Sequence, residues 1–311
     1  MSGGEKKTPR AAVVREFETP AGLPAVLVDC RDSGVFSVEK TFDCGQSFRF
    51  SPVGGDPRVV CGSVRIGEGE DARITVDGTR EAAGLLTLAG CTAEEFGSRW
   101  RSYLDLDADY GAGEKRILDA LPEGRSRDAM ADALRAGRGI RLLRQDPWEM
   151  LVTSILTQNN NIPRIRGIAA RLCAASGGRF PEPADILRIG TEGLYALGCG
   201  FRAKYLTDAA ERTADGRADP RKIAAMGTED ARAVLEQIRG VGPKVASCAL
   251  LFGYHRTEAF PVDVWMKRAL AEIFPDGVDP TLFGEWAGYA QQCMFWAERE
   301  KGKKKLAVKS C

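Results

Sequence analysis

The sequence contains a single histidine, His255, and nine cysteines, none of which pair at a C-x-x-C spacing. Zinc ribbons and iron-sulfur loops need thiolates or imidazoles in tight clusters. We therefore expect neither zinc nor an iron-sulfur cluster, and we interpret His255 as a loop residue. The odd number of cysteines favours a reducing compartment.

Long apolar runs and a strong excess of charge are also absent. No stretch approaches the roughly 18 apolar residues that cross a bilayer, and residues 1–10 lack the apolar core of a signal peptide. We expect a soluble protein that is not secreted. In a prokaryote we expect it in the cytoplasm or nucleoid, and in a eukaryote in the nucleus. Because the formal charge is only +1, positive charge for an anionic partner must be local, as in the lysine-rich segment 301–305.

What the sequence does contain is a change of periodicity near residue 115. Before it, short β-rich runs predict an antiparallel sheet at residues 25–28, 48–50, 59–61, 64–66 and 74–76. After it, the apolar spacing is helical and is interrupted by prolines. We predict an α+β protein with the active site between its two domains. The predicted parts are a disordered tail (1–10), a sheet domain (11–115), a helical domain (116–300) and a basic tail (301–311).

A helix-hairpin-helix pattern lies in the second half of the chain. Apolar residues recur at i, i+3, i+4 and i+7 from Ala231, and Thr228 is predicted to cap this helix. Gly240-Val241-Gly242 then forms a turn that opens the backbone N–H groups of a following helix to an anion. Such a hairpin can bind DNA phosphates without reading bases. An ordinary αα-hairpin is the alternative.

Two residues beside this turn can carry chemistry. Lys244 is a nucleophile only as the neutral amine, which burial favours, and it could then attack a sugar C1′ and form a Schiff base. Asp263 is predicted to cap the N-terminus of a further helix, where its negative charge is stabilised. Next to a deoxyribose it could stabilise the positive charge that develops as a base departs. Taken singly, a phosphate contact explains Lys244 and a structural cap explains Asp263.

Together these features resemble the helix-hairpin-helix (HhH-GPD) superfamily of DNA base-excision glycosylases. Within it, the chain resembles the eukaryotic-type 8-oxoguanine DNA glycosylase/AP lyase branch. Five further motifs stand in the family's order: Cys44-Gly45-Gln46-Ser47-Phe48-Arg49, Ile140-Arg141-Leu142-Leu143-Arg144-Gln145-Asp146-Pro147, Asn159-Asn160-Asn161-Ile162, Leu197-Gly198-Cys199-Gly200-Phe201-Arg202-Ala203, and Tyr289-Ala290-Gln291 with Phe295. Such collinearity is more specific than any one motif.

The resemblance implies a TBP-like antiparallel sheet domain beside an all-α glycosylase domain. It implies an enzyme that flips 8-oxoguanine, paired with cytosine, out of double-stranded DNA and removes it through a Schiff base at Lys244, with Asp263 as the catalytic aspartate. The strand is then cleaved by β-elimination. It also implies a monomer that needs no cofactor for catalysis, and it leaves open a monovalent or divalent cation at the hairpin.

By the same resemblance, four residues form the pocket for the flipped base. Cys248 and Phe295 match the residues that pack on its two faces, and Gln291 matches the one that reads its Watson-Crick edge. Gly45 matches the residue whose backbone carbonyl accepts the N7–H of 8-oxoguanine. Guanine has no proton at N7, so this carbonyl would attract the lesion and repel the normal base.

Other residues match contacts to DNA. Asn159 corresponds to the residue that fills the hole left by the flipped base and pairs with the orphaned cytosine, and Arg164 to a second contact with that cytosine. Phe201 and Arg202 are further predicted DNA contacts. Phe201 and Trp265 replace a tyrosine and a histidine of the animal members, so hydrogen bonds from a phenol or imidazole are lost there. Phe201 can still wedge beside a base step, and selectivity for the opposite base is expected to be looser.

Two other hypotheses explain part of these sequence features. One retains the chemistry but assigns another lesion, such as an oxidised pyrimidine or an abasic site, and the four pocket residues argue against it. The other is a DNA-binding hairpin without enzymatic activity, which would require neither Lys244 nor Asp263.

Overall fold

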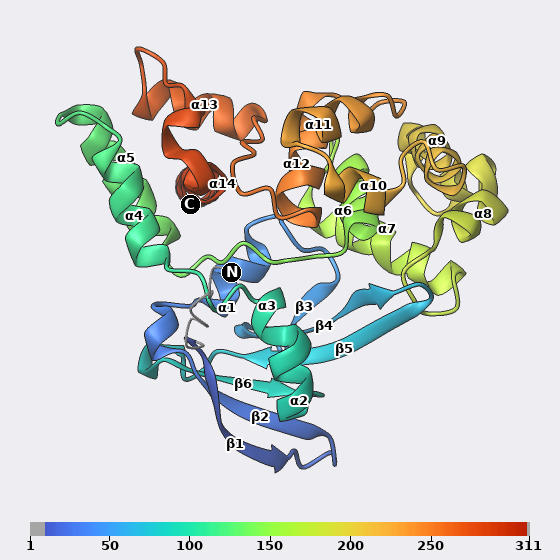
Figure 1. Ribbon diagram of the computed structural model, residues 1–311, viewed down its shortest axis with the longest axis horizontal. Helices are drawn as coiled ribbons and strands as arrows, with labels where there is room; N and C mark the ends of the chain where they lie inside the picture. The colour runs from blue at the N-terminus through green and yellow to red at the C-terminus, as the bar shows by residue number, and fades with distance from the viewer. Residues whose placement is uncertain (1–9, 310–311) are drawn as a thin grey trace, which may run out of the picture.

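The computed structural model describes residues 10–309, apart from the side chains of residues 304–309. Of the tail predicted at residues 1–10, residues 1–9 lie outside the described residues, and Arg10 pairs with Asp109 at 2.7 Å. The N-terminal third of the chain forms a sheet, and helices follow it (Figure 1). The predicted α+β class is confirmed.

Six strands form one antiparallel sheet in the order β1-β2-β6-β5-β4-β3. Their bounds are β1 Ala12–Glu18, β2 Pro24–Asp29, β3 Phe50–Val53, β4 Asp56–Gly67, β5 Glu70–Asp77 and β6 Leu85–Ala89. The two runs predicted at 59–61 and 64–66 are parts of the single strand β4. Val60, Gly62 and Val64 alternate on its buried face, and Gly62 lies so close to the ring of Phe50 that a side chain would collide with it.

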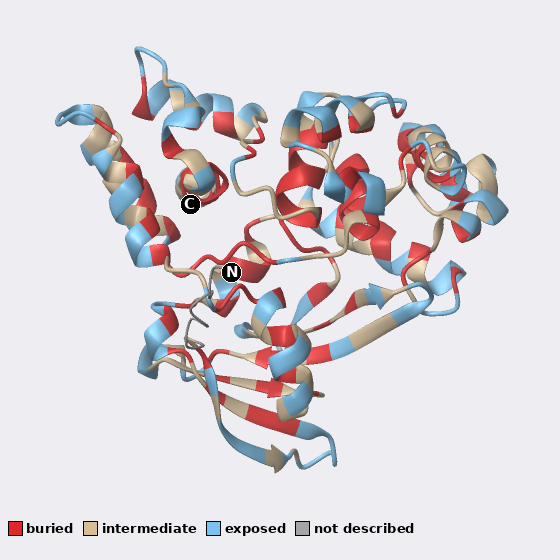
Figure 2. Ribbon diagram, in the orientation of Figure 1, coloured by how far each residue is buried: buried red, intermediate tan, exposed pale blue. Residues whose placement is uncertain are grey.

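Short helices complete the sheet domain. They are η1 Arg31–Ser33, α1 Val38–Asp43, η2 Glu81–Ala83, α2 Ala93–Glu95, the π-helical turn η3 Phe96–Trp100, and α3 Arg101–Tyr103. Their apolar side chains, Phe42 and Trp100 among them, pack with the inward residues of the strands in one hydrophobic core. Figure 2 shows buried strand segments in red that alternate mainly with partly exposed segments in tan.

The helical domain has its own core. Its elements are α4 Tyr110–Asp119, α5 Arg125–Gly137, α6 Pro147–Leu156, α7 Ile162–Ala175, α8 Pro183–Ala196, η4 Gly200–Arg202, α9 Ala203–Ala214, α10 Pro220–Ala225, α11 Thr228–Glu236, α12 Pro243–Gly253, α13 Val264–Ile273, η5 Pro280–Trp286 and α14 Ala287–Lys309. Within residues 10–309 no helix combines the length and hydropathy that crossing a bilayer requires.

Two predicted boundaries differ from the structure. The boundary at 115/116 falls inside α4, whose Tyr110 and Ile117 pack in the helical core, so we place the division just before α4. The basic tail predicted from residue 301 is instead the last part of α14, which continues to Lys309. Lysine is a good helix former, so a lysine-rich run can extend a helix that packing has already started.

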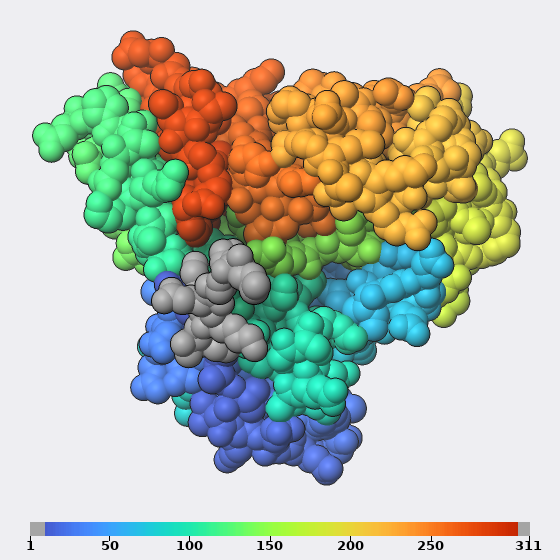
Figure 3. Space-filling view, in the orientation of Figure 1, coloured from blue at the N-terminus to red at the C-terminus, as the bar shows by residue number. Residues whose placement is uncertain are grey.

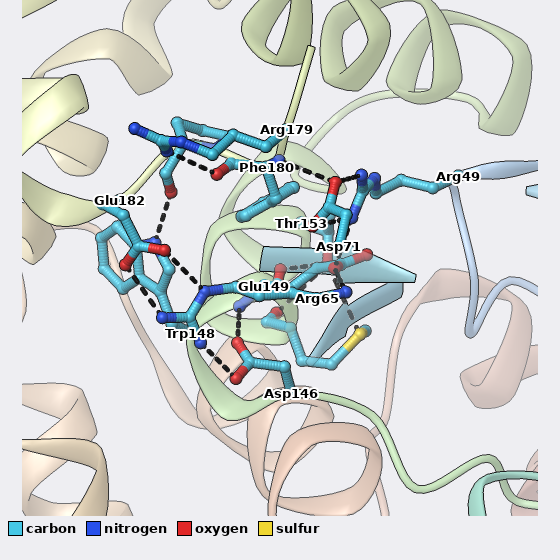
Figure 4. Close-up of polar contacts among 12 residues, drawn as sticks. Arg49, Arg65, Asp71, Asp146, Trp148, Glu149, Thr153, Arg179, Phe180 and Glu182 are labelled. Atoms are coloured by element: carbon cyan, nitrogen blue, oxygen red, sulfur yellow. Dashed lines mark hydrogen bonds and ion pairs between the residues drawn. The ribbon is translucent and has the colours of Figure 1, made fainter. Parts of the chain in front are cut away.

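A buried ionic network joins the two domains (Figure 4). Arg65 on β4 donates to Glu182 at 2.8 Å and also pairs with Asp146. Arg49, which precedes β3, lies 3.0 Å from Glu149 on α6, and burial raises the pKa of Glu149 to about 7. Removing one member of such a network would leave an uncompensated buried charge. The network therefore fixes α6 relative to the sheet. In Figure 3 the sheet domain, in blue and cyan, lies directly against the helical domain.

Candidate active site

The hairpin between α11 and α12 has the predicted glycine turn. Gly240 has φ +76°, and a Cβ there would collide with the ring of Tyr205. Val241 buries its side chain in the core, and the space beside Gly242 is open. The turn is thus anchored by one side chain and presents its backbone outward. The predicted cap is wrong by one residue, because Gly227 is the N-cap of α11 and the Thr228 hydroxyl bonds Glu258 instead.

A cavity of about 450 Å³ opens beside this hairpin. Its walls come from both domains: the segment after α1, the end of α6 and start of α7, α12, the start of α13, and α14. Six predicted site residues line it: Gly45, Lys244, Cys248, Asp263, Gln291 and Phe295. A volume of this size is typical of a site for a small molecule or a single base.

The two predicted catalytic residues lie on helix N-termini. Lys244, in the first turn of α12, donates from Nζ to Thr157 Oγ1 at 2.9 Å. Asp263 caps α13 as predicted, because its carboxylate accepts the backbone N–H of Met266 at 2.8 Å. A helix N-terminus favours an anion, so the carboxylate is held in place beside the cavity.

Cys248 lies one helical turn after Lys244 and is buried. Burial raises the pKa of its thiol, an effect that the neighbouring Lys244 ammonium opposes. The side chain therefore offers the cavity a neutral, polarisable surface rather than a reactive thiolate.

Gly45 faces Phe295 across the cavity. It has φ +87°, and a Cβ built on it would lie 3.7 Å from Phe295 Cε1 and 3.9 Å from Ile162 Cδ1. The neighbouring Gln46, which is fully buried, fixes this turn. Its Nε2 donates to the carbonyl of Arg141 at 2.7 Å.

Two arginines hold the segment just before Gly45, and the sequence interpretation missed both. Arg166 on α7 donates to the carbonyl of Phe42 at 3.1 Å. Arg299 on α14 donates to the carbonyl and the carboxylate of Asp43. The helical domain thus holds, through its own side chains, the segment of the sheet domain that carries Gly45.

The amide of Gln291 also has a neighbour that the sequence did not indicate. Gln292 Nε2 donates to Gln291 Oε1 at 2.7 Å, and both side chains line the cavity. This bond occupies one lone pair of the Gln291 oxygen and orients its amide.

The predicted DNA contacts lie outside the cavity lining. Asn159 is exposed in a left-handed turn after α6, with φ +46°, and Arg164 is exposed in the first turn of α7. Phe201 is 45% exposed. Arg202, in contrast, is only 2% exposed and donates to the carbonyls of Gln158 and Asn159. A direct DNA contact does not fit this burial, so Arg202 supports the Asn159 turn from behind.

Trp265, one of the two departures from the animal members, also lines the cavity. Its ring lies against Gly302 of α14, where an added Cβ would be 2.9 Å from Trp265 Cζ3. Among the described residues, no three His, Cys, Asp or Glu side chains are grouped closely enough to hold a metal ion.

Comparison with protein families matches two consecutive segments of the chain, which meet inside α6. Residues 30–151 match the N-terminal domain of 8-oxoguanine DNA glycosylase, and residues 152–281 match the HhH-GPD superfamily of base-excision DNA repair proteins. The chain belongs to the 8-oxoguanine DNA glycosylase family of the helix-hairpin-helix superfamily. The predicted family is confirmed, and with it the class of enzyme, an N-glycosylase and DNA lyase.

Individual relatives agree with this assignment. The N-glycosylase/DNA lyase of Saccharomyces cerevisiae is 36% identical over 42% of this chain and 41% of its own length, so the match spans less than half of that protein. The Arabidopsis thaliana N-glycosylase/DNA lyase OGG1 is 29% identical over 90% of this chain and 81% of its own. The Clostridium acetobutylicum 8-oxoguanine glycosylase/lyase, solved with double-stranded DNA containing cytosine opposite 8-oxoguanine, has a TM-score of 0.76 at 28% identity, over 93% of this chain and 99% of its own.

Proposed function

We propose that this protein removes 8-oxoguanine paired with cytosine from double-stranded DNA and then cleaves the strand at the resulting site. The observation that carries the proposal is that one cavity brings together the amine of Lys244, the capping carboxylate of Asp263, the glycine turn at Gly45 and the aromatic ring of Phe295. The relative from Clostridium acetobutylicum was solved in complex with double-stranded DNA containing cytosine opposite 8-oxoguanine.

In this proposal, Lys244 is the nucleophile. The lone pair of its neutral Nζ forms a bond to C1′ of the flipped nucleotide, while the C1′–N9 bond breaks and its electron pair leaves with the base. The fixed carboxylate of Asp263 stabilises the positive charge that develops on the sugar. Loss of a proton from Nζ and opening of the sugar ring give the Schiff base. Removal of a C2′ proton then expels the 3′ phosphate, which cleaves the strand.

The base is recognised at two of its edges and on both of its faces. The carbonyl of Gly45 accepts the N7–H that only the oxidised base carries. Cys248 and Phe295 pack on the two faces of the ring, and the amide of Gln291 pairs with its Watson-Crick edge. Stacking on an aromatic ring is worth about 1–3 kcal/mol per base, which offsets part of the cost of flipping.

The duplex is held by contacts outside the cavity. The backbone of the Gly240-Val241-Gly242 turn binds phosphate, and Asn159, Arg164 and Phe201 occupy or flank the hole opposite cytosine. We expect the protein to act as a monomer, because the residues of a single chain line the cavity. We expect the enzyme in the cytoplasm or nucleoid of a prokaryote and in the nucleus of a eukaryote, since its proposed substrate is DNA.

The test uses duplexes that each carry one defined lesion opposite one defined base. Cleaved and uncleaved strands are separated on denaturing gels, and Schiff bases are trapped with borohydride. We expect cleavage at 8-oxoguanine opposite cytosine, a trapped adduct with wild-type protein, and no adduct with Lys244→Gln, which keeps length and polarity but cannot form an imine. Lys222→Gln removes an exposed lysine on α10 and serves as the matched control.

Two outcomes would contradict the proposal. An adduct at wild-type yield with Lys244→Gln would show that another amine is the nucleophile. Cleavage of oxidised pyrimidines with 8-oxoguanine left intact would favour the hypothesis of the same chemistry on another lesion.

A further inference from the structure

Thr157 is the side chain that holds the amine of Lys244, and neither the sequence motifs nor the family match indicated it. Its Oγ1 accepts a hydrogen bond from Lys244 Nζ at 2.9 Å, and it lines the cavity. The two residues come from different helices, because Thr157 is the C-cap of α6 and Lys244 lies in the first turn of α12. These two helices pack directly against each other.

The hydroxyl proton of Thr157 is already committed elsewhere. Thr157 Oγ1 donates to the carbonyl of Ser154 at 2.7 Å, and the Thr157 backbone N–H donates to the carbonyl of Thr153 at 3.0 Å. The oxygen can therefore act toward Lys244 only as an acceptor. Because α6 is buried from Trp148 to Leu156, the helix that carries this acceptor is held in place.

We propose that Thr157 is the positioning residue of the nucleophile. A lysine side chain has several rotatable bonds, and ordering it costs up to about 2 kcal/mol of side-chain entropy. One N–H of Nζ directed at a fixed oxygen restricts the directions left for the lone pair, which must point at C1′ to react. The hydroxyl oxygen of Thr157 is uncharged. It therefore orients the Lys244 amine without adding a negative charge that would favour the protonated ammonium. This inference rests on the role of Lys244 in the proposed function.

The experiment compares three full-length variants on a duplex with 8-oxoguanine opposite cytosine. Thr157→Val keeps the shape of the side chain but removes the acceptor, and Thr157→Ser restores the hydroxyl. Thr153→Val is the matched control, because Thr153 lies one turn earlier on α6, its hydroxyl donates to the carbonyl of Glu149 at 2.8 Å, and it does not line the cavity. Single-turnover excision, the rate of borohydride trapping, the Kd for the lesion duplex and the free energy of unfolding are measured for each.

For Thr157→Val we expect excision and trapping to slow at least about fivefold, which is the effect of losing one neutral hydrogen bond. The Kd should stay within about twofold, since Thr157 is not proposed to touch DNA. Thr157→Ser should recover most of the rate, and Thr153→Val should excise at the wild-type rate even if it is less stable. If Thr157 had only a structural role, the excision rate would not fall while the Kd and the free energy of unfolding stayed unchanged.

The inference is overturned if Thr157→Val excises at the wild-type rate, or if the serine variant is as slow as the valine variant. Either result would leave the proposed function intact as long as Lys244→Gln still abolishes the adduct. An adduct that persists in Lys244→Gln would instead remove the proposed function, and the role of Thr157 with it.

Discussion

Replacing Gly45 with alanine tests whether the cavity identifies 8-oxoguanine through a backbone carbonyl. The substitution adds one methyl group and removes the freedom of glycine to adopt positive φ. At φ +87° an alanine is strained by roughly 1–2 kcal/mol. The backbone can relieve this strain by rotating, but rotation moves the carbonyl that is proposed to accept N7–H.

The space around Gly45 determines where the effect should appear. The added Cβ would lie 3.7 Å from Phe295 Cε1, which is an ordinary contact, so the folded protein without DNA should tolerate it. The methyl group would, however, occupy the cavity beside the ring on which the base is proposed to stack. We expect excision of 8-oxoguanine to fall at least about tenfold, equivalent to about 1.4 kcal/mol. Cleavage of a preformed abasic site should change much less, because no base is read there.

The assay measures single-turnover cleavage of both substrates opposite cytosine, together with the free energy of unfolding. Gly54→Ala is the matched control. Gly54 also has positive φ, at +60°, but a Cβ there meets nothing within 4 Å. Gly54→Ala therefore introduces the same kind of backbone strain at a position that does not line the cavity. If Gly45→Ala lowers both activities equally, Gly45 is a folding residue of the sheet domain and the reasoning from N7–H fails.

Three further predictions concern Asp263, Phe295 and Glu149. Asp263→Asn should slow excision by orders of magnitude, since one preorganised charge is typically worth ~2.7–4 kcal/mol of barrier. The free energy of unfolding should change little, because Asn also caps helices. Excision at the wild-type rate would show that Asp263 is only a helix cap. Phe295→Ala should weaken binding of lesion DNA more than undamaged DNA, as titration of both duplexes would show, whereas equal losses would assign the ring to the core. Burial raises the pKa of Glu149 from 4.5 to about 7. Protonated Glu149 therefore stabilises the folded protein fully at pH values below its pKa in the unfolded chain, and this contribution is lost as the pH rises through 7. Between about pH 5 and pH 7, wild-type unfolding free energy should therefore fall relative to Glu149→Gln, and parallel pH profiles in denaturant would refute this.

Local signals in the sequence predicted the elements that they specify. The cap at Asp263 and the glycine turn before α12 depend on residues within a few positions of one another, and both were placed correctly. Strand β1 was missed because it is an edge strand with mostly exposed residues and no clear alternation. The last turns of α14 were missed because a lysine-rich composition does not distinguish a tail from a helix that packing has already started.

The candidate site shows the same difference between residues that the sequence predicted and residues that it did not. Six of the residues that line the cavity were predicted, Lys244 and Asp263 from the hairpin and cap patterns and the others because their motifs appear in the family's order. Thr157 and Arg299 carry no such motif, and their partners are remote: Thr157 and Lys244 are 87 residues apart, and Arg299 and Asp43 are 256 apart. No periodicity or capping rule connects residues at these separations, so only the folded structure could pair them.

In the proposed function, the contact that distinguishes 8-oxoguanine from guanine and the nucleophile that removes the base come from different domains. The carbonyl of Gly45 comes from the sheet domain, whereas Lys244 comes from the helical domain. Arg166 and Arg299 hold the segment before Gly45 against the helical domain, together with the bond from Gln46 to Arg141 and the buried ionic network. A shift between the domains would move the carbonyl away from N7–H while leaving the amine and its threonine partner on α12 and α6 undisturbed. Discrimination between guanine and 8-oxoguanine should therefore be more sensitive to contacts between the domains than is cleavage of a sugar that has already lost its base.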